Sequence, residues 1–193
     1  MTKLKPPADR RSFADAWDEV EYLYDKVLYW LYERADTGKS KPYAERLKRL
    51  LVKADPKQEA IFGAECRSLI HEVEGDLVKA ITQRRKEIRL IRRLHQLTEN
   101  LPQRECAERY DYQDLSDRLD LLATLYQEKG NLDKAIETLR ESKQVCTTHA
   151  LAFDGEDILQ ECLEEKMKEK KLVPRTKAEP AASVAQRRAR RRD

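Results

Sequence analysis

Gly75-Asp76-Leu77-Val78-Lys79-Ala80-Ile81 returns later in the chain as Gly130-Asn131-Leu132-Asp133-Lys134-Ala135-Ile136, 55 positions further on. The two copies differ only at their second and fourth residues. A segment that recurs in this way is usually part of a supersecondary unit that buries its apolar face by stacking on a neighbouring copy. The repetition therefore favours a scaffold of stacked units, and a binding protein over an enzyme.

The residues around the second copy predict two helices joined by a very short turn. Gly130 supplies the left-handed residue that ends the first helix, and Asn131 is a good N-cap for the second. Apolar residues at steps of three and four mark the buried face of each helix. On the first helix these are Leu115, Leu119, Leu122, Ala123 and Tyr126, and on the second they are Leu132, Ala135, Ile136 and Leu139, with Ser142 on the same face.

At these positions the chain resembles a tetratricopeptide repeat, a helix-turn-helix unit of about 34 residues. The matching residues are Leu119, Leu122, Ala123, Tyr126, Gly130, Leu132, Ala135 and Leu139. The resemblance covers residues 116–149 and implies an all-α fold of antiparallel helix pairs. It departs from the family pattern at Thr147, where a proline often closes the unit.

The first copy, residues 61–94, is a degenerate match to the same pattern. It keeps Ser68, Gly75, Leu77, Ala80 and Ile81. His71 replaces the large aromatic residue, and Arg84 stands where an apolar residue is expected. We expect Ile88 and Ile91 to provide the packing that Arg84 cannot.

The spacing of 55 residues is explained by a longer second helix in the first copy and an inserted segment after it. This helix is expected to run to about Asn100. Residues 85–96 would then extend past the partner helix and be exposed on at least one side. The stretch is strongly basic, with Arg85, Lys86, Arg89, Arg92 and Arg93 against Glu87.

Another helical pair, residues 12–54, is predicted before the first copy. Ser12 is the expected cap of its first helix, and Ser40 followed by Pro42 is expected to open its second. Most of the aromatic residues lie in this region: Tyr22, Tyr24, Tyr29, Trp30, Tyr32 and Tyr43. Two interpretations stay open, namely a core with its packing surface, or an exposed aromatic groove for a peptide.

The predicted architecture is a short right-handed α-solenoid of the tetratricopeptide type, formed as one domain over residues 12–172. Its helix pairs span residues 12–54, 57–99 and 115–147. A polar helix at residues 156–171 would cover the last apolar face. Residues 1–11 and 173–193 contain little apolar material and are expected to be disordered.

The charge of the chain is divided unevenly between its ends and its body. The whole chain carries +3, residues 1–11 carry +3 and residues 173–193 carry +5, which leaves −5 on residues 12–172. No aromatic residue interleaves the arginines near the C-terminus, so base stacking is not indicated. No apolar run is long enough to cross a bilayer and the chain starts with polar residues, so we expect a cytoplasmic protein without membrane contact.

The sequence predicts no catalytic, cofactor or metal site. The four cysteines are far apart in sequence and are expected to be reduced, buried thiols: Cys66, Cys106, Cys146 and Cys162. His71-Glu72 lacks the second histidine of a zinc-protease helix, and no glycine-rich phosphate loop is present. We therefore expect a non-catalytic protein without cofactors.

The leading functional hypothesis is a protein-interaction scaffold. Tetratricopeptide units bind partner segments along the face formed by their first helices. The resemblance places these groove residues at Phe62, Glu65, Leu69 and Glu72 in the first copy, and at Asp117, Asp120, Leu121, Thr124, Gln127 and Glu128 in the second. Because this set is acidic and apolar, the expected partner is a basic or amphipathic peptide or helix of another protein.

Alternatives stay open beside this hypothesis. A nucleic-acid-associated protein would contact phosphates with the basic helix and tail, through Arg85, Arg89, Arg92, Arg93, Arg187, Arg188, Arg190, Arg191 and Arg192. The arginine-rich tail could instead occupy the chain's own groove or that of another copy. Because at least three stacked units are usually needed for stability, a homo-oligomer is a further possibility.

Overall fold

The computed structural model describes residues 12–53, 60–98 and 110–172. Within these ranges the chain forms seven α-helices and one π-helical turn, and no strand. Their bounds are α1 Ala16–Leu28, η1 Tyr29–Glu33, α2 Thr37–Leu51, α3 Ala60–Val73, α4 Leu77–Thr98, α5 Tyr112–Glu128, α6 Leu132–Thr148 and α7 Glu156–Leu172. The prediction of an all-helical fold is confirmed for the residues that the structure describes.

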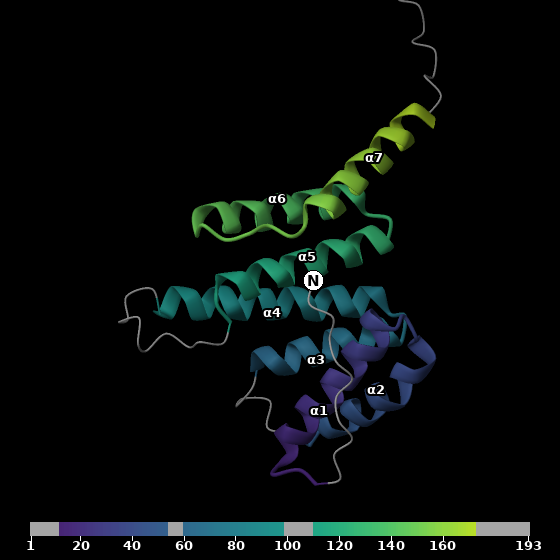
Figure 1. Ribbon diagram of the computed structural model, residues 1–193, viewed down its shortest axis with the longest axis vertical. Coiled ribbons are helices and arrows are strands. Elements are labelled where there is room, and N and C mark those ends of the chain that lie inside the picture. Colours follow the sequence, from purple (N-terminus) through teal and green to yellow (C-terminus); the bar gives the residue numbers. More distant parts are fainter. Residues whose placement is uncertain (1–11, 54–59, 99–109, 173–193) are drawn as a thin grey trace, which may run out of the picture.

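Consecutive helices pack against each other as pairs, α1 with α2, α3 with α4, and α5 with α6. Each pair also contacts the next along the chain, through α2 with α3 and α4 with α5, and α7 packs on α6. The helices therefore follow their chain order from α1 at one end of the molecule to α7 at the other (Figure 1). Adjacent packed pairs are thus present, as the sequence predicts.

The repeated sequence builds the same turn twice. Gly75 and Gly130 both have a φ of +76°, the left-handed conformation that favours glycine. The amide after each glycine donates a hydrogen bond to the carbonyl five residues earlier, at 2.8 Å in both turns. Asp76 and Asn131 then accept a hydrogen bond from the amide three residues later, at 3.1 and 3.2 Å. The predicted glycine turn and the Asn131 cap are therefore confirmed.

The first helical pair starts at other residues than predicted. Asp15 caps α1, and Asp36 caps α2, so the predicted starts at Ser12 and Ser40 are wrong. In both cases an aspartate a few residues away from the serine accepts hydrogen bonds from free amides of the first turn. Pro42 consequently lies inside α2 rather than at its first turn.

The buried apolar residues form two clusters. The N-terminal cluster lies between α1, α2 and α3 and includes Val20, Leu47 and Leu69. The C-terminal cluster joins α4, α5, α6 and α7 and includes Leu119 and Leu139. Aromatic side chains of the first pair pack half-buried against the N-terminal cluster: Trp17, Tyr22, Tyr24 and Tyr43. This arrangement favours the interpretation of the aromatic residues as core and packing surface.

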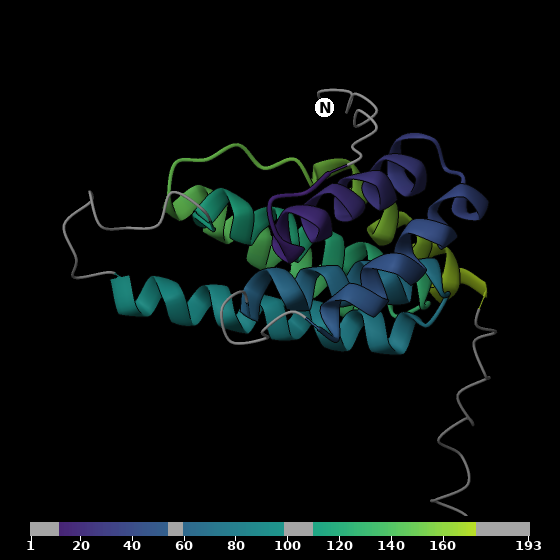
Figure 2. The same ribbon diagram turned by 90° about the horizontal axis from the view of Figure 1, so that it is seen from below.

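The helix α4 is the longest of those described and runs past the end of α3 (Figure 2). As expected, Ile88 and Ile91 are buried on its inner face, and its outer face is basic and exposed at Arg85, Lys86, Arg89 and Arg93.

The thiols of Cys66, Cys146 and Cys162 are buried and free. Cys106, the terminal segments predicted to be disordered and the arginines at 187–192 lie outside the described residues.

Candidate functional site

A chain of paired polar side chains crosses the interior between the two apolar clusters. We call it the charged layer. Its members, each bonded to the next, are Tyr24, Glu65, Arg118, Glu87, Arg84, Glu72 and Tyr32. They come from α1, α3, α4, α5 and η1, so the layer connects residues that are far apart in sequence.

Two arginines hold the charged layer together, because each bridges two carboxylates. Arg118 donates from Nη2 to Glu65 and from Nε to Glu87, both at 2.7 Å. Arg84 donates from Nη1 to Glu87 at 2.8 Å and from Nη2 to Glu72 at 3.2 Å. Glu87 thereby receives both guanidinium groups. Planar guanidinium groups suit this bridging geometry better than ammonium groups do.

Arg84 is buried, which corrects its reading as a position that cannot take part in packing. Its side chain is 1% exposed and that of Glu87 is 0% exposed. Burial lowers the pKa of the Arg84 guanidinium, but Glu87 and Glu72 raise it by more, so Arg84 stays charged. A buried charge is tolerated only when it is paired in this way. Arg84 can therefore occupy an apolar position of the repeat, because Glu72 and Glu87 neutralise its charge there.

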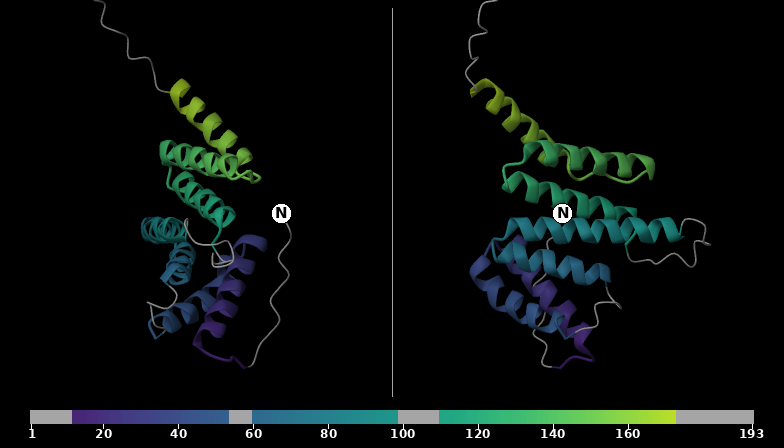
Figure 3. Two further views of the ribbon diagram at one scale, coloured as in Figure 1. Left: turned by 90° about the vertical axis from the view of Figure 1, so that its left-hand side faces the viewer. Right: turned by 180° about the vertical axis from the view of Figure 1, so that it is seen from behind.

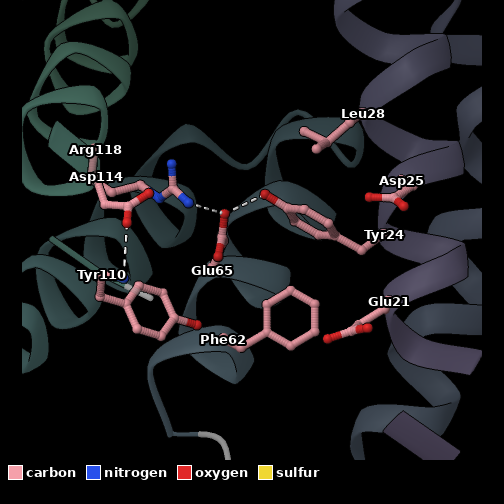
Figure 4. Close-up of a pocket in the computed structure, with 9 residues that line it drawn as sticks. All are labelled: Glu21, Tyr24, Asp25, Leu28, Phe62, Glu65, Tyr110, Asp114 and Arg118. Atoms are coloured by element: carbon pink, nitrogen blue, oxygen red, sulfur yellow. Dashed lines mark hydrogen bonds and ion pairs between the residues drawn. The ribbon is translucent and has the colours of Figure 1, made fainter. Parts of the chain in front are cut away.

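One end of the charged layer opens into a pocket of about 450 Å³ between α1, α3 and α5. We call it the acidic pocket, and Figure 4 shows its lining. The lining residues are Glu21, Tyr24, Asp25, Leu28, Phe62, Glu65, Tyr110, Asp114 and Arg118. Four carboxylates therefore face the space against a single guanidinium group. The volume lies in the range of typical ligand sites.

The carboxylates come from opposite walls of the acidic pocket. Figure 4 shows Glu21 and Asp25 on the α1 side, Asp114 on the α5 side, and Glu65 between them. The rings of Tyr24 and Phe62 are in edge-to-face contact, with their centroids 5.2 Å apart. The pocket therefore combines acidic groups on two sides with aromatic surface, a combination that suits an organic cation.

The electrostatics of the pocket walls also favour a bound cation. Burial raises the pKa of Asp25, and the neighbouring Glu21 raises it further. Burial also raises the pKa of Tyr24 well above its ordinary value, and Glu65 adds to this effect, so the phenol stays protonated and donates a hydrogen bond to Glu65. On the α1 wall, two carboxylates repel each other, and a cation bound between them would relieve that repulsion.

The start of α5 is fixed where it borders the pocket. Asp111 caps the helix and accepts a hydrogen bond from the amide of Asp114 at 2.9 Å. Asp114 in turn accepts from the amides of Asp111 and Tyr110, at 3.1 and 2.8 Å. This capping box holds the Asp114 carboxylate at the rim of the pocket.

The groove residues expected from the first copy are mostly covered. Phe62 and Glu65 line the acidic pocket, although each is only 3% exposed. Leu69 is 0% exposed, in the N-terminal cluster. Glu72 is bound by Arg84 and Tyr32. Since α1 and η1 lie over this side of α3, the first copy presents a pocket rather than an open groove.

The groove residues expected from the second copy lie along α5. They are exposed at Asp117 and Glu128 and half-buried at Asp120, Leu121, Thr124 and Gln127. None of them lines the acidic pocket. Burial raises the pKa of Asp120 to about 6, and Asp117 and Asp154 contribute to the rise. Its Oδ1 is buried and has no hydrogen-bond partner among the described residues.

Several pocket residues were missed from the sequence. The spacing of Glu21 and Asp25 by four residues on one helix is a signal that two carboxylates share a face. The Asp111 and Asp114 pair is a recognisable capping pattern. For Arg118 no local signal exists, because its partners lie on α3 and α4 and only the fold brings them together.

The basic residues on α4 form a separate surface. Arg85, Arg89 and Arg93 are exposed at steps of four along one side of the helix. Arg92 instead pairs with Glu141 of α6. The arginine surface therefore consists of three exposed side chains in the part of the chain that the structure describes.

Comparisons with protein-family models, curated proteins and solved structures found no match for this chain. Over the described ranges, no group of histidine, cysteine, aspartate and glutamate residues could hold a metal ion. None of the described helices has the length and apolarity needed to span a membrane. The class that can be stated is therefore an all-helical protein of packed helix pairs with an acidic pocket.

Proposed function

We propose that this protein is a non-catalytic interaction scaffold of the tetratricopeptide-like solenoid type, which binds a basic segment of a partner protein at the acidic pocket. The observation that carries the proposal is the lining of that pocket, with four carboxylates against one guanidinium group in about 450 Å³. The segment would place a cationic side chain between the α1 wall and the α5 wall. The acidic residues along α5 would guide the rest of it.

Two carboxylates of the pocket are already held in place by neighbouring groups, which supports this proposal. Glu65 is held by Arg118 and Tyr24, and Asp114 is held by the capping box, so neither has to reorganise when a ligand enters. Glu21 and Asp25 are exposed at the rim and supply the attraction. A preorganised acidic site lowers the ordering cost of binding.

The proposal is tested with a fluorescein-labelled peptide of alternating glycine and arginine, and an acidic peptide of alternating glycine and glutamate. Fluorescence polarisation with the full chain should detect only the basic peptide. The double variant Glu21→Gln with Asp25→Asn should bind it about tenfold more weakly, which corresponds to about 0.7 kcal/mol per lost carboxylate. Because both residues are exposed, the fold should be retained.

The matched control is the double variant Glu45→Gln with Glu137→Gln, which removes two exposed carboxylates outside the pocket. It should bind the basic peptide as the natural chain does. The proposal fails if the two double variants weaken binding equally, or if no basic peptide binds even after the C-terminal arginines are replaced by glutamine.

A second candidate function is phosphate contact with RNA or DNA through the arginine surface of α4. The regular spacing of Arg85, Arg89 and Arg93 favours it, since one side of a helix can follow a phosphate backbone. A salt titration of binding to mixed-sequence RNA and DNA tests this function. The triple change to glutamine should flatten the salt dependence, and absence of binding at low salt would exclude it.

A further inference from the structure

The charged layer shows what kind of cation this interior selects. Arg118 and Arg84 each bridge two carboxylates through different nitrogens. The acidic pocket continues the same pattern outward, with carboxylates on opposite walls and the ring surfaces of Tyr24 and Phe62 between them. A guanidinium group can donate to two carboxylates while its plane stacks on a ring, whereas an ammonium group can do only part of this.

We infer that the arginine-rich segment 186–192 of the same chain occupies the acidic pocket and competes there with the basic segment of a partner. This inference rests on the function proposed above and adds the regulation of that site. An interaction scaffold whose pocket holds its own C-terminal segment binds a partner only when the partner displaces it.

The charges of the two elements are complementary. The segment carries five arginines and no lysine, at Arg187, Arg188, Arg190, Arg191 and Arg192. The described body is acidic, and the pocket lining carries four carboxylates against one guanidinium group. Arginine is the side chain that the carboxylate pairs of this interior already bind, so the composition of the segment matches the geometry of the pocket.

The stretch of chain between α7 and the arginine-rich segment is long enough for the segment to reach the pocket. That helix leaves the body at an angle, so the chain has to return along it (Figure 3). The start of α7 lies beside α5, since a side chain at Gly155 would meet Asp120 Oδ1 at 2.9 Å. The 17 residues of α7 extend about 25 Å, and the stretch of α5 from Asp120 back to Asp114 adds about 9 Å.

Between Leu172 and Gln186 the chain has about 13 residues, which span at most about 43 Å when extended. This exceeds the path of about 34 Å to the pocket rim. A tether of about 13 residues over a path of this length corresponds to an effective concentration on the order of 1 mM. An intrinsic dissociation constant of about 0.1 mM would then weaken a competing ligand about tenfold.

The experiment compares three full-length chains in their affinity for a labelled peptide with the sequence of residues 186–193. The first is the natural chain, the second has all five arginines of the segment changed to glutamine, and the third has them changed to lysine. The glutamine chain should bind the peptide about tenfold more tightly than the natural chain. The lysine chain should resemble the glutamine chain, because the pocket selects guanidinium groups.

Each other outcome identifies what has failed. If the lysine chain behaves as the natural chain, charge alone explains the effect and the inference is overturned. The inference is also overturned if the ratio of affinities between the glutamine chain and the natural chain grows with protein concentration. A second copy of the chain would then supply the segment. If all chains bind equally and Glu21→Gln with Asp25→Asn weakens each of them, the proposed function stands without this regulation. If none binds the peptide, the proposed function fails as well.

Discussion

The hairpins α3–α4 and α5–α6 have turns of the same geometry, but they bury different side chains. Each contains a left-handed glycine followed by a capping side chain. At equivalent positions, 55 residues apart, the second hairpin buries Leu139 where the first buries Arg84. The turn is therefore set by local sequence, whereas the interior depends on what packs against the hairpin. For α3–α4 that is the charged layer, which Arg118 of α5 and two tyrosines from α1 and η1 complete.

The two hairpins also differ in the surroundings of one equivalent carboxylate. Glu65 and Asp120 occupy equivalent positions of the two copies. Glu65 is bonded to Arg118 and Tyr24 at the floor of the acidic pocket. Asp120 has a buried oxygen without a hydrogen-bond partner among the described residues, and burial raises its pKa to about 6. Of these two carboxylates, only Glu65 is paired with an arginine within the described part of the chain.

The strongest way to break the contrast is to place the arginine in the wrong hairpin. Leu139 is 0% exposed in the C-terminal cluster, so Leu139→Arg buries a charge among apolar neighbours. We expect a loss of about 5 kcal/mol or more in the free energy of unfolding, measured by urea denaturation with circular dichroism. The neighbouring exposed change Arg140→Leu should stay within about 0.5 kcal/mol. A folded Leu139→Arg chain of natural stability would contradict the assignment of this interior as apolar.

The reverse change removes the arginine from the first hairpin. Arg84→Met leaves Glu72 without its guanidinium partner and Glu87 with Arg118 alone. A loss of about 3 kcal/mol is expected, because a buried carboxylate then lacks a counter-charge. Arg85→Met, one residue further along α4 and exposed, serves as the control and should change stability by less than about 0.5 kcal/mol. Equal effects of the two changes would show that Arg84 is not paired in solution.

The sequence predicts both turns and the buried apolar face of α5–α6, but not the charged interior of α3–α4. Gly75, Gly130 and Asn131 act on their immediate neighbours, so their effect is readable from a short window. The N-terminal caps were misplaced because a serine and an aspartate compete within a few residues of each other. Arg84 looked like a defect of the repeat, since nothing near it in sequence indicates that Arg118 would share Glu87. The acidic pocket depends on the same long-range packing of α1 on α3 and α5.

A milder test asks whether the two turns are equivalent. No atom lies within 4 Å of a Cβ added at Gly75 or Gly130, and both have φ of +76°. Changing either glycine to alanine should therefore cost about 1 kcal/mol through the backbone alone, and the same amount in both. Thermal or urea unfolding of the two variants checks this. A difference above about 0.5 kcal/mol would mean that the turns differ in ways that their geometry does not show.

The smallest expected effect concerns Asp120. Its pKa in the fold is about 6, above the ordinary value of 3.8, so the fold disfavours its charge. Its contribution to stability is fully present below about pH 4 and is lost as pH rises through 6. Asp120→Asn should therefore stabilise the protein by up to about 1 kcal/mol at pH 7.5, after allowance for its partial exposure, and have no effect near pH 4. Urea unfolding at the two pH values measures this, and a gain of equal size at both would refute it.

Paired charges hold the interior of the first hairpin, whereas apolar contacts hold that of the second. A double-mutant cycle on Arg84→Met and Glu87→Met, followed by urea unfolding, tests it most directly. Because each single change leaves the other charge buried, we predict a coupling of at least about 1.5 kcal/mol between the two positions. Additive effects, with a coupling below about 0.5 kcal/mol, would show that Arg84 and Glu87 do not stabilise each other.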